Sequence, residues 1–456
     1  MQKLDKIIAE FSSLAWGLPL LLLLVGGGIY LLIRSRFLPF TFFIHALKIL
    51  RGKYDDPNAP GEISHFKALT TALSSTIGMG NIAGVALAIS VGGPGAMFWM
   101  WVSALVGMST KFFTSSLAIM FRGKDSNGEI QGGPMYFIVE GLGKNWKPLA
   151  AMFAIFGTLG ALPVVNVNQL KQAINDIILV PNGVDVSLQT NLIIAGILVL
   201  ATSVVILGGL KRISYMASKL VPSMVILYFI LVVFILLSNI AEVPKYLILI
   251  FKDAFEANFI KGDSFLGGML GALILLGIRR GAFSNEAGIG TAPMAHGAAK
   301  TAEPVREGLV AMLGPAIDTL IVCTLTALAI LVTGVWETTS ENGVTLTAAA
   351  FSQAMPNIGA YALMVCVFVF SISSLFSYSY YGTKCMSFLF GADKKHLYNY
   401  LYILSIVLAA TTDFTTMINL IDGVFALMAI PTMTATLILA PKVIKELKAY
   451  KSRMKP

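Results

Sequence analysis

The sequence predicts an all-α polytopic membrane protein with about eleven transmembrane helices. Hydrophobic residues make up 56% of the 456-residue chain, charged residues make up 12%, and the mean hydropathy is +0.78. One water-soluble core cannot bury that much apolar surface, so lipid must act as the solvent for most of it. Because a spanning helix takes roughly 20 apolar residues, the candidate spans lie near 14–33, 66–91, 94–120, 148–171, 190–208, 215–239, 265–298, 309–333, 358–381, 397–411 and 417–441.

The first span, at 14–33, follows a short start with Lys3 and Lys6, which is also how a cleaved signal peptide begins. The apolar run is too long for a signal peptide, and no small-residue cleavage site comes before Arg34. We therefore expect it to remain as a membrane helix. The expected organisation is a start, first helix and loop at 1–65, five-helix halves at 66–240 and 241–441, and a basic tail at 442–456.

The basic residues are sorted by loop, and this sorting predicts the topology. Alternate loops, beginning with 34–67, contain 24 of the 33 Lys and Arg residues, whereas the opposite set contains six. Cytoplasmic loops carry the Lys and Arg excess in membrane proteins, so we expect the amino terminus outside and the carboxyl terminus in the cytoplasm. The net charge of +9 is thereby explained by a bilayer partner, with the tail against anionic lipid, and nucleic acid is not an expected partner.

Residue types with chemical reactivity do not form a catalytic pattern. The three cysteines lie in or beside apolar spans, which argues against a disulfide framework. The four histidines lack metal-ligand spacing, and no HExxH motif or nucleophile with an accompanying His is present. We therefore expect neither an enzyme nor an organic cofactor.

The second and seventh spans are the most heavily interrupted by glycine and polar residues. Both contain the pattern Asn-x-Ala-Gly, at 81–84 and again at 285–288. The copies are five spans apart and so have opposite orientations, which predicts an inverted repeat of five plus five helices behind one extra helix. Unwound backbone is tolerated at membrane depth only where it lines a cavity, so the paired breaks indicate a transporter's binding site.

Both predicted breaks fall near the middle of the membrane. The midplane of a layer ~30 Å thick lies about 10 to 15 residues into a span. This places one break at 78–80 and the other at 277–280. An alternative is that the glycines are helix-packing residues of the small-xxx-small type, a pattern that Gly80 and Gly84 also fit. A nucleotide-binding glycine loop is disfavoured because no strand precedes either run.

A small zwitterion that crosses lipid must have its carboxylate and its ammonium satisfied without water. Half-helix amino ends offer N–H groups to the carboxylate, while freed carbonyls at carboxyl ends suit an ammonium or a cation. Gly78, Gly80 and Gly277 let the backbone approach closely and leave a small pocket, which suits glycine or alanine. Near the midplane of the ninth span, Ser373 and Ser374 belong to a hydroxyl cluster. Such hydroxyls either ligate an alkali cation or bond to neighbouring helices, and spacing does not choose between these roles.

Four runs of sequence closely resemble the sodium:alanine symporter family, whose members are alanine or glycine:cation symporters. The runs are GGPGAMFWMWVSALVG at 92–107, GGPMYF at 132–137, FSNEAG at 283–288 and SYYG at 379–382, and the similarity covers nearly the whole chain. The resemblance implies the LeuT-type five-plus-five inverted-repeat fold shared with neurotransmitter:sodium symporters, with one extra helix in front.

The same resemblance implies which residues bind the ligands. A sodium ion would lie between the first and eighth core helices, held by the carbonyls of Ser74, Ile77 and Phe370 and the hydroxyls of Ser373 and Ser374. The implied substrate-binding residues are Thr76, Ile77, Gly78, Gly80, Asn81, Asn166, Gln169, Gly277 and Tyr378. Tyr378 stands where the family usually has Trp, so the preferred amino acid stays open.

Several ionisable residues fall at membrane depth, where a charge is costly and usually functional. Lys171 stands where the family usually has Asn, and it either replaces a cation near the site or extends to the outer water. The others are Lys111, Arg279, Arg280, Glu286 and Asp318. For these we expect structural ion pairs, such as Asp318 with Arg279 or Arg280, rather than a proton relay.

The sequence thus predicts a secondary active transporter in the cell membrane. We expect it to work as a monomer that couples inward sodium movement to uptake of alanine or glycine by alternating access. Proton coupling in the same fold is the alternative. A channel is a further alternative, but the inverted repeat with two breaks argues against the continuous pore that a channel needs.

Overall fold

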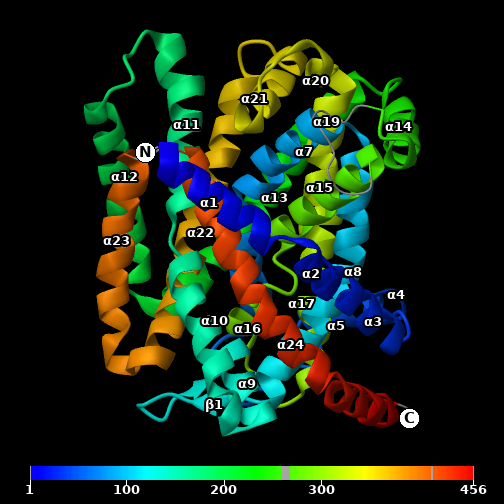
Figure 1. Ribbon diagram of the computed structural model, residues 1–456, viewed down its shortest axis with the longest axis vertical. Coiled ribbons are helices and arrows are strands. Elements are labelled where there is room, and N and C mark those ends of the chain that lie inside the picture. The colour runs from blue at the N-terminus through cyan, green and yellow to red at the C-terminus, as the bar shows by residue number, and fades with distance from the viewer. Residues whose placement is uncertain (1, 259–267, 412–413, 455–456) are drawn as a thin grey trace.

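The computed structural model describes residues 2–258, 268–411 and 414–454. In these ranges the chain is a bundle of helices with one short hairpin, which agrees with the predicted all-α membrane fold (Figure 1). Strands β1 (Gly123–Lys124) and β2 (Ile130–Gln131) pair antiparallel, with Gly123 opposite Gln131. In Figure 1 this hairpin and α9 (Pro134–Leu142) lie at the lower end of the bundle, where the carboxyl terminus also lies.

The chain begins with short helices that wrap the outside of the bundle. They are α1 (Gln2–Ala15), α2 (Leu18–Leu21), the π-helical η1 (Leu22–Gly26), α3 (Gly27–Arg34), α4 (Leu38–Thr41) and α5 (Phe43–Leu50). The stretches Lys6–Ala15 and Leu18–Arg34 meet at a bend of 40°. Helix α1 packs along α24 (Phe414–Met454), as Figure 1 shows.

The first predicted broken helix is present where the sequence places it. Helix α6 (His65–Thr76) begins at the cap Ser64, whose hydroxyl accepts from the Lys67 N–H at 3.4 Å. It ends because Ile77 turns to an extended backbone with ψ 93°, ahead of Gly78. The chain resumes as the π-helical η2 (Gly80–Gly84) and α7 (Val85–Gly92), bent by 54° from α6.

Six further α-helices, joined in places by short 3-10 and π-helical turns, complete the described residues of the first half of the chain. They are α8 (Gly95–Met120), the 3-10 turn η3 (Lys144–Trp146), α10 (Lys147–Gly160), α11 (Val164–Ile174), the π-helical η4 (Asn175–Leu179), the 3-10 turn η5 (Val180–Asn182), α12 (Leu188–Ile206), α13 (Gly209–Ser238) and α14 (Val243–Glu256).

The second break lies elsewhere than predicted. Helix α15 (Gly268–Asn285) runs without interruption through Gly277, so the predicted break at 277–280 is wrong. The backbone leaves the helix at Glu286 and re-forms as α16 (Ala292–His296), with left-handed backbone at Glu286, Gly288 and Gly290. The reason is packing: a methyl group on Gly277 would come within 2.5 Å of Trp99 Cβ on α8. Gly277 is therefore a small helix-packing residue, the alternative interpretation of the glycine pattern.

The remaining elements close the bundle. They are α17 (Pro304–Ala311), α18 (Leu313–Pro315), the π-helical η6 (Ala316–Cys323), α19 (Thr324–Thr333), α20 (Val335–Thr338), α21 (Gly343–Ala354), α22 (Gly359–Phe390), the 3-10 turn η7 (Ala392–Lys394), α23 (Lys395–Thr411) and α24.

Helix length and composition support a multi-pass membrane protein. Within the described ranges, seven helices are long and apolar enough to cross a membrane, or up to nine if each of two bent pairs is one span. The number eleven stays a prediction, as do the domain boundaries. Helix α6 packs against α13 and α22, while α8 packs against α15 and α17, so both breaks are held inside the bundle.

Candidate functional site

A small pocket lies at the break between α6 and η2. Its volume is about 40 Å³, which is space for about three waters. It is lined by Ser75, Thr76, Gly78, Met79, Gly80, Gly160, Leu162, Val165, Asn166, Gln169, Phe283, Glu286, Tyr378, Ile421 and Phe425. The pocket therefore combines α6, α10, α11, α15, α22 and α24 around one opening in the helix.

Each asparagine of the repeated Asn-x-Ala-Gly pattern accepts a backbone N–H at its own break. At the first break, Asn81 Oδ1 accepts from the Gly78 N–H at 2.9 Å. At the second break, Asn285 Oδ1 accepts from the Ala287 N–H at 3.0 Å. Each side chain thus satisfies a backbone donor that the interrupted helix leaves open.

Asp318 on η6 joins the two breaks to each other. Asn81 Nδ2 donates to Asp318 Oδ1 at 2.7 Å, and Ser284 Oγ, one residue before Asn285, donates to Asp318 Oδ2 at 2.8 Å. The Thr319 hydroxyl donates to the same Oδ2 at 2.7 Å, and the Asp318 side chain is fully buried. One carboxylate therefore holds both interrupted helices at a common point.

The expected ion pair of Asp318 with Arg279 or Arg280 is wrong. Arg279 Nη2 instead donates to Asp422 Oδ2 on α24 at 2.7 Å, and the guanidinium lies 5.5 Å from the centre of the Trp16 ring. Arg279 is about two turns before the second break, on the face of α15 toward α1 and α24, where it is partly exposed. Spacing along the sequence could not reveal that face, because α15 is helical through the predicted break.

The predicted sodium ligands come from two helices that touch. The hydroxyls of Ser373 and Ser374 both donate to the Phe370 carbonyl, at 2.9 Å and 3.0 Å. A side-chain carbon on Gly78 would come within 2.8 Å of Ser374 Oγ, so this hydroxyl faces the break in α6. The hydroxyls of Ser74 and Ser377 are hydrogen-bonded to each other across α6 and α22. The Ser374 hydroxyl therefore lies at the carboxyl end of α6, where the last carbonyls of a helix lack intrahelical partners, whereas Ser373 Oγ lies 3.6 Å from Met224 Sδ on α13.

The structure brings together most of the predicted substrate residues. Those that line the pocket are Thr76, Gly78, Gly80, Asn166, Gln169 and Tyr378. Ile77 and Asn81 are buried directly behind this lining. Gly277 is not among the lining residues of the pocket, since it packs against α8. Lys171 lies two residues after Gln169 on α11 and is half-buried.

Glu286 is a residue of the site that its sequence pattern alone did not reveal. Glu286 lines the pocket, and its two carboxylate oxygens accept hydrogen bonds from the hydroxyls of Tyr378 and Thr291. The available signal was its position in the FSNEAG run, inside a span where a carboxylate is costly. The sequence instead predicts a structural ion pair for Glu286.

Two segments are hydrogen-bonded to each other at the end of the bundle that carries the Lys- and Arg-rich loops. We call the segments 54–67 and 296–307 the clasp. Their backbones pair: the Lys300 N–H donates to the Ile63 carbonyl at 2.7 Å, and the Glu62 N–H donates to the Ala298 carbonyl at 2.8 Å. Arg122, just beyond α8, donates to carbonyls on both segments, including those of Pro60 at 3.1 Å and Thr301 at 2.9 Å.

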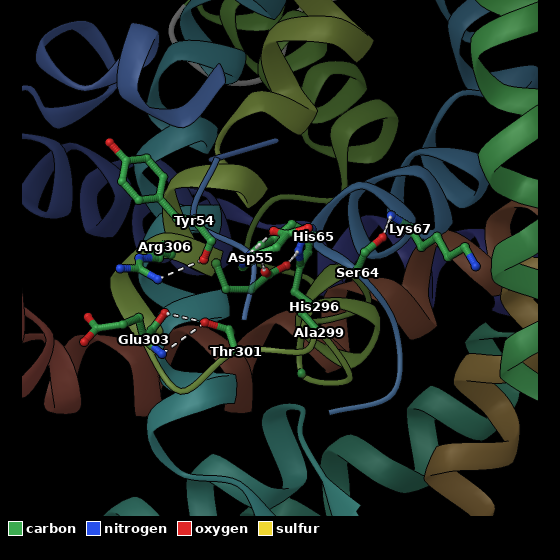
Figure 2. Close-up of polar contacts among 12 residues, drawn as sticks. Tyr54, Asp55, Ser64, His65, Lys67, His296, Ala299, Thr301, Glu303 and Arg306 are labelled. Carbon is green, nitrogen blue, oxygen red and sulfur yellow. Dashed lines mark hydrogen bonds and ion pairs between the residues drawn. The ribbon is translucent and has the colours of Figure 1, made fainter. Parts of the chain in front are cut away.

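Side chains also cross the clasp, as Figure 2 shows. The fully buried Glu307 accepts hydrogen bonds from Nδ1 of His65 and Nδ1 of His296 through its two oxygens. Nearer the edge, Arg306 Nη1 donates to the Tyr54 carbonyl at 3.0 Å. The clasp thus joins the segment that enters the first broken helix to the segment that leaves the second.

Two interrupted helices that meet at a small polar pocket inside a membrane bundle define a secondary transporter. The sequence model of the sodium:alanine symporter family matches residues 1–456. The chain belongs to this family, so it is a multi-pass membrane transporter and not an enzyme.

Comparison with individual proteins also identifies the chain as a membrane transporter. The chain is 40% identical to the sodium/alanine symporter AgcS of Methanococcus maripaludis over 97% of its own length and 96% of that protein. It is 34% identical to the protein named "Probable sodium/glutamine symporter GlnT" of Bacillus subtilis, over 100% of its own length and 92% of the relative. The crystal structure of MhsT in complex with L-phenylalanine has a TM-score of 0.61 at 14% identity, covering 83% of this chain and 89% of that one. The last similarity shows the fold.

Proposed function

We propose that the protein couples inward sodium movement to the uptake of a small neutral amino acid, alanine or glycine, by alternating access. The observation that carries this proposal is the pocket at the first break. The pocket is small, and its lining combines polar side chains with the backbone of Gly78 and Gly80, which suits a small zwitterion such as alanine or glycine. The names of AgcS and GlnT both include sodium, which supports sodium as the coupling ion.

The sodium ion is proposed to bind beside the pocket, between α6 and α22. Hydroxyl and carbonyl oxygens are hard ligands that suit a dehydrated alkali cation. The five proposed ligands are the carbonyls of Ser74, Ile77 and Phe370 and the hydroxyls of Ser373 and Ser374. Because Ser374 Oγ lies against Gly78, a cation held there would fix the end of α6 next to the substrate. Binding of the ion and binding of the substrate would then strengthen each other, since coupling between two sites is reciprocal.

The double substitution Ser373→Ala and Ser374→Ala is expected to raise the sodium concentration for half-maximal uptake by roughly tenfold or more, since each lost hydroxyl contributes about 1 kcal/mol. Sodium-dependent uptake into liposomes measures this change. Ser379→Ala is the matched control, because Ser379 lies on the same helix and donates to the Phe376 carbonyl at 2.7 Å. Unchanged sodium dependence in a well-folded double variant would contradict the assignment.

Gly78→Ala is expected to reduce sodium-driven uptake by roughly tenfold or more, because an added methyl group would come within 2.8 Å of Ser374 Oγ at the proposed ion site. Gly84→Ala is the matched control, since no atom lies within 4 Å of the position where its methyl group would be. Initial uptake rates of the two variants, normalised to the amount of folded protein, make the comparison. Equal rates for both variants would argue against close packing at the break.

The clasp is proposed to close the pathway on the cytoplasmic side. This placement follows from the Lys and Arg excess in the loops at that end, which also puts the amino terminus outside and the carboxyl terminus in the cytoplasm. We propose that one chain is sufficient for transport, because the pocket and the proposed ion site are built from one bundle.

The proposed function is tested by uptake of radiolabelled alanine into liposomes that contain the purified protein. An inward sodium gradient is compared with an equal potassium gradient and with an inward proton gradient. Saturable accumulation that requires sodium is the expected result. Accumulation driven by protons without sodium would favour proton coupling, and uptake that does not saturate would favour a channel.

A further inference from the structure

Glu286 is the one carboxylate among the described residues that line the pocket. Its side chain is only 2% exposed, and its backbone is left-handed with φ 52°. A residue other than glycine in this conformation costs about 1–3 kcal/mol and persists only where the surroundings hold it. Here the second break holds Glu286 so that its side chain reaches the pocket.

Two hydroxyl groups fix the orientation of this carboxylate. The Tyr378 hydroxyl on α22 donates to Oε1, and the Thr291 hydroxyl, just ahead of α16, donates to Oε2. An ionised carboxylate offers about four acceptor positions. The two hydroxyls therefore orient the group and leave acceptor capacity toward the pocket.

The described residues give Glu286 no cationic side chain within 4.0 Å, and the same holds for Asp318. The buried Lys111 of α8 interacts electrostatically with both carboxylates from farther away. Two buried carboxylates and one buried ammonium leave one negative charge over when all three are ionised. Since an unpaired buried charge is costly, this region is suited to receive a cation from outside the protein.

A second acceptor in the same pocket lacks a partner. Gln169 Oε1 on α11 is buried and makes no hydrogen bond within the described part of the chain. An ammonium group has three donors, so it would satisfy this amide oxygen and the Glu286 carboxylate together. The proposed sodium ligands lie at a different place, on the α22 side of the carboxyl end of α6.

We propose that Glu286 binds the ammonium group of the transported amino acid, with Tyr378 and Thr291 as positioning residues for its carboxylate. This inference rests on the proposed function, since it names the group that recognises the substrate. If Glu286 binds the ammonium group, the site requires that group in its ligand. A molecule with the same carboxylate and methyl groups, but with a hydroxyl in place of the ammonium, should then not bind. L-Lactate is that molecule for L-alanine.

The test measures competition by L-lactate and by unlabelled L-alanine against labelled alanine uptake, in the wild type and in Glu286→Gln. The wild type is expected to respond to alanine and to ignore lactate. In Glu286→Gln the alanine concentration for half-maximal uptake should rise roughly 30- to 1,000-fold, in the range for loss of one partner of a buried charge pair. The ratio of lactate to alanine potency should move toward one, while the sodium dependence at saturating alanine should not change. Glu10→Gln is the control, at a carboxylate whose side chain is 69% exposed on α1.

Other results of the competition experiment would contradict either the inference or the proposed function. Equal competition by lactate and alanine in the wild type overturns the inference without any variant, which covers the case in which Glu286→Gln does not fold. An unchanged potency ratio in folded Glu286→Gln also overturns it, and a shift in sodium dependence alone would assign the carboxylate to the ion. A wild-type protein that accumulates neither alanine nor glycine overturns the proposed function, and the inference with it.

Discussion

Asp318→Ala is expected to lower the free energy of unfolding by about 2–4 kcal/mol and to abolish transport. The substitution removes the acceptor of three buried donors, on Asn81, Ser284 and Thr319. The two hydroxyls can turn to other acceptors, but the Asn81 amide is fixed by its bond to the Gly78 N–H. Asn81 Nδ2 keeps its bonds to the Asp318 carbonyl at 3.2 Å and to Cys323 Sγ at 3.3 Å, but the carboxylate that joins it to Ser284 is lost. Thermal unfolding of the detergent-solubilised protein and alanine uptake measure the two effects.

Asp318→Asn is the matched control for this substitution. An amide presents its oxygen to Asn81 and its nitrogen to the hydroxyls of Ser284 and Thr319, which are able to accept. The asparagine variant should therefore unfold near the wild-type temperature, and its transport activity reports on the negative charge alone. An alanine variant as stable as the asparagine variant would show that the two breaks do not depend on this link.

Glu307→Ala is expected to reduce stability by about 3–5 kcal/mol, because it leaves two histidine donors unpaired inside the clasp. His65 and His296 are both buried, so their donors would face the space left by the carboxylate and not bulk water. Loss of this contact should also open the end of the pathway that the clasp closes. The measurements are the unfolding temperature and the rate at which a thiol reagent modifies a cysteine introduced at Thr76, in a background without reactive native cysteines.

Glu303→Ala provides the comparison, four residues earlier in the sequence. Glu303 pairs with Arg453 at 2.9 Å, with side chains that are 29% and 50% exposed. A partly exposed pair contributes up to about 1 kcal/mol, so this variant should differ little from the wild type. Similar unfolding temperatures for the two alanine variants would contradict a structural role for the buried cluster.

The two breaks show how far sequence reasoning extends. Hydropathy predicted the membrane bundle, and the glycine-rich run before Asn81 predicted the first break. The predicted second break at 277–280 lies six to nine residues before the observed one at Glu286, because Gly277 and Gly281 suggest flexibility although both pack tightly against α8. In a sequence, a glycine at an unwound turn looks the same as a glycine at a close helix crossing. Only the position of the neighbouring helix distinguishes these two roles.

The polar groups of the site were predictable to different degrees. The hydroxyl cluster in the ninth span made Ser373 and Ser374 candidates, but spacing left their role open and only the family resemblance implied that they bind sodium. The partner of Asp318 was not predictable, because Asn81 is more than 200 positions away and reaches η6 only once both helices are packed. Glu286 belongs to the same category, since its orientation depends on Tyr378, 92 positions later in the chain, and on the backbone path that brings Thr291 to its other oxygen.

The link between Asn81 and Asp318 also affects how this chain is compared with its relatives. Both residues lie on π-helical stretches, η2 and η6, where each turn closes over one more residue than an α turn. An ordinary α-helix with the same number of residues at η6 would present everything beyond it rotated by about 100°. Residue equivalences with a distant relative must therefore be counted separately before and after each π turn. An alignment without a gap at η6 pairs the wrong faces of α19 whenever the relative has an ordinary helix there.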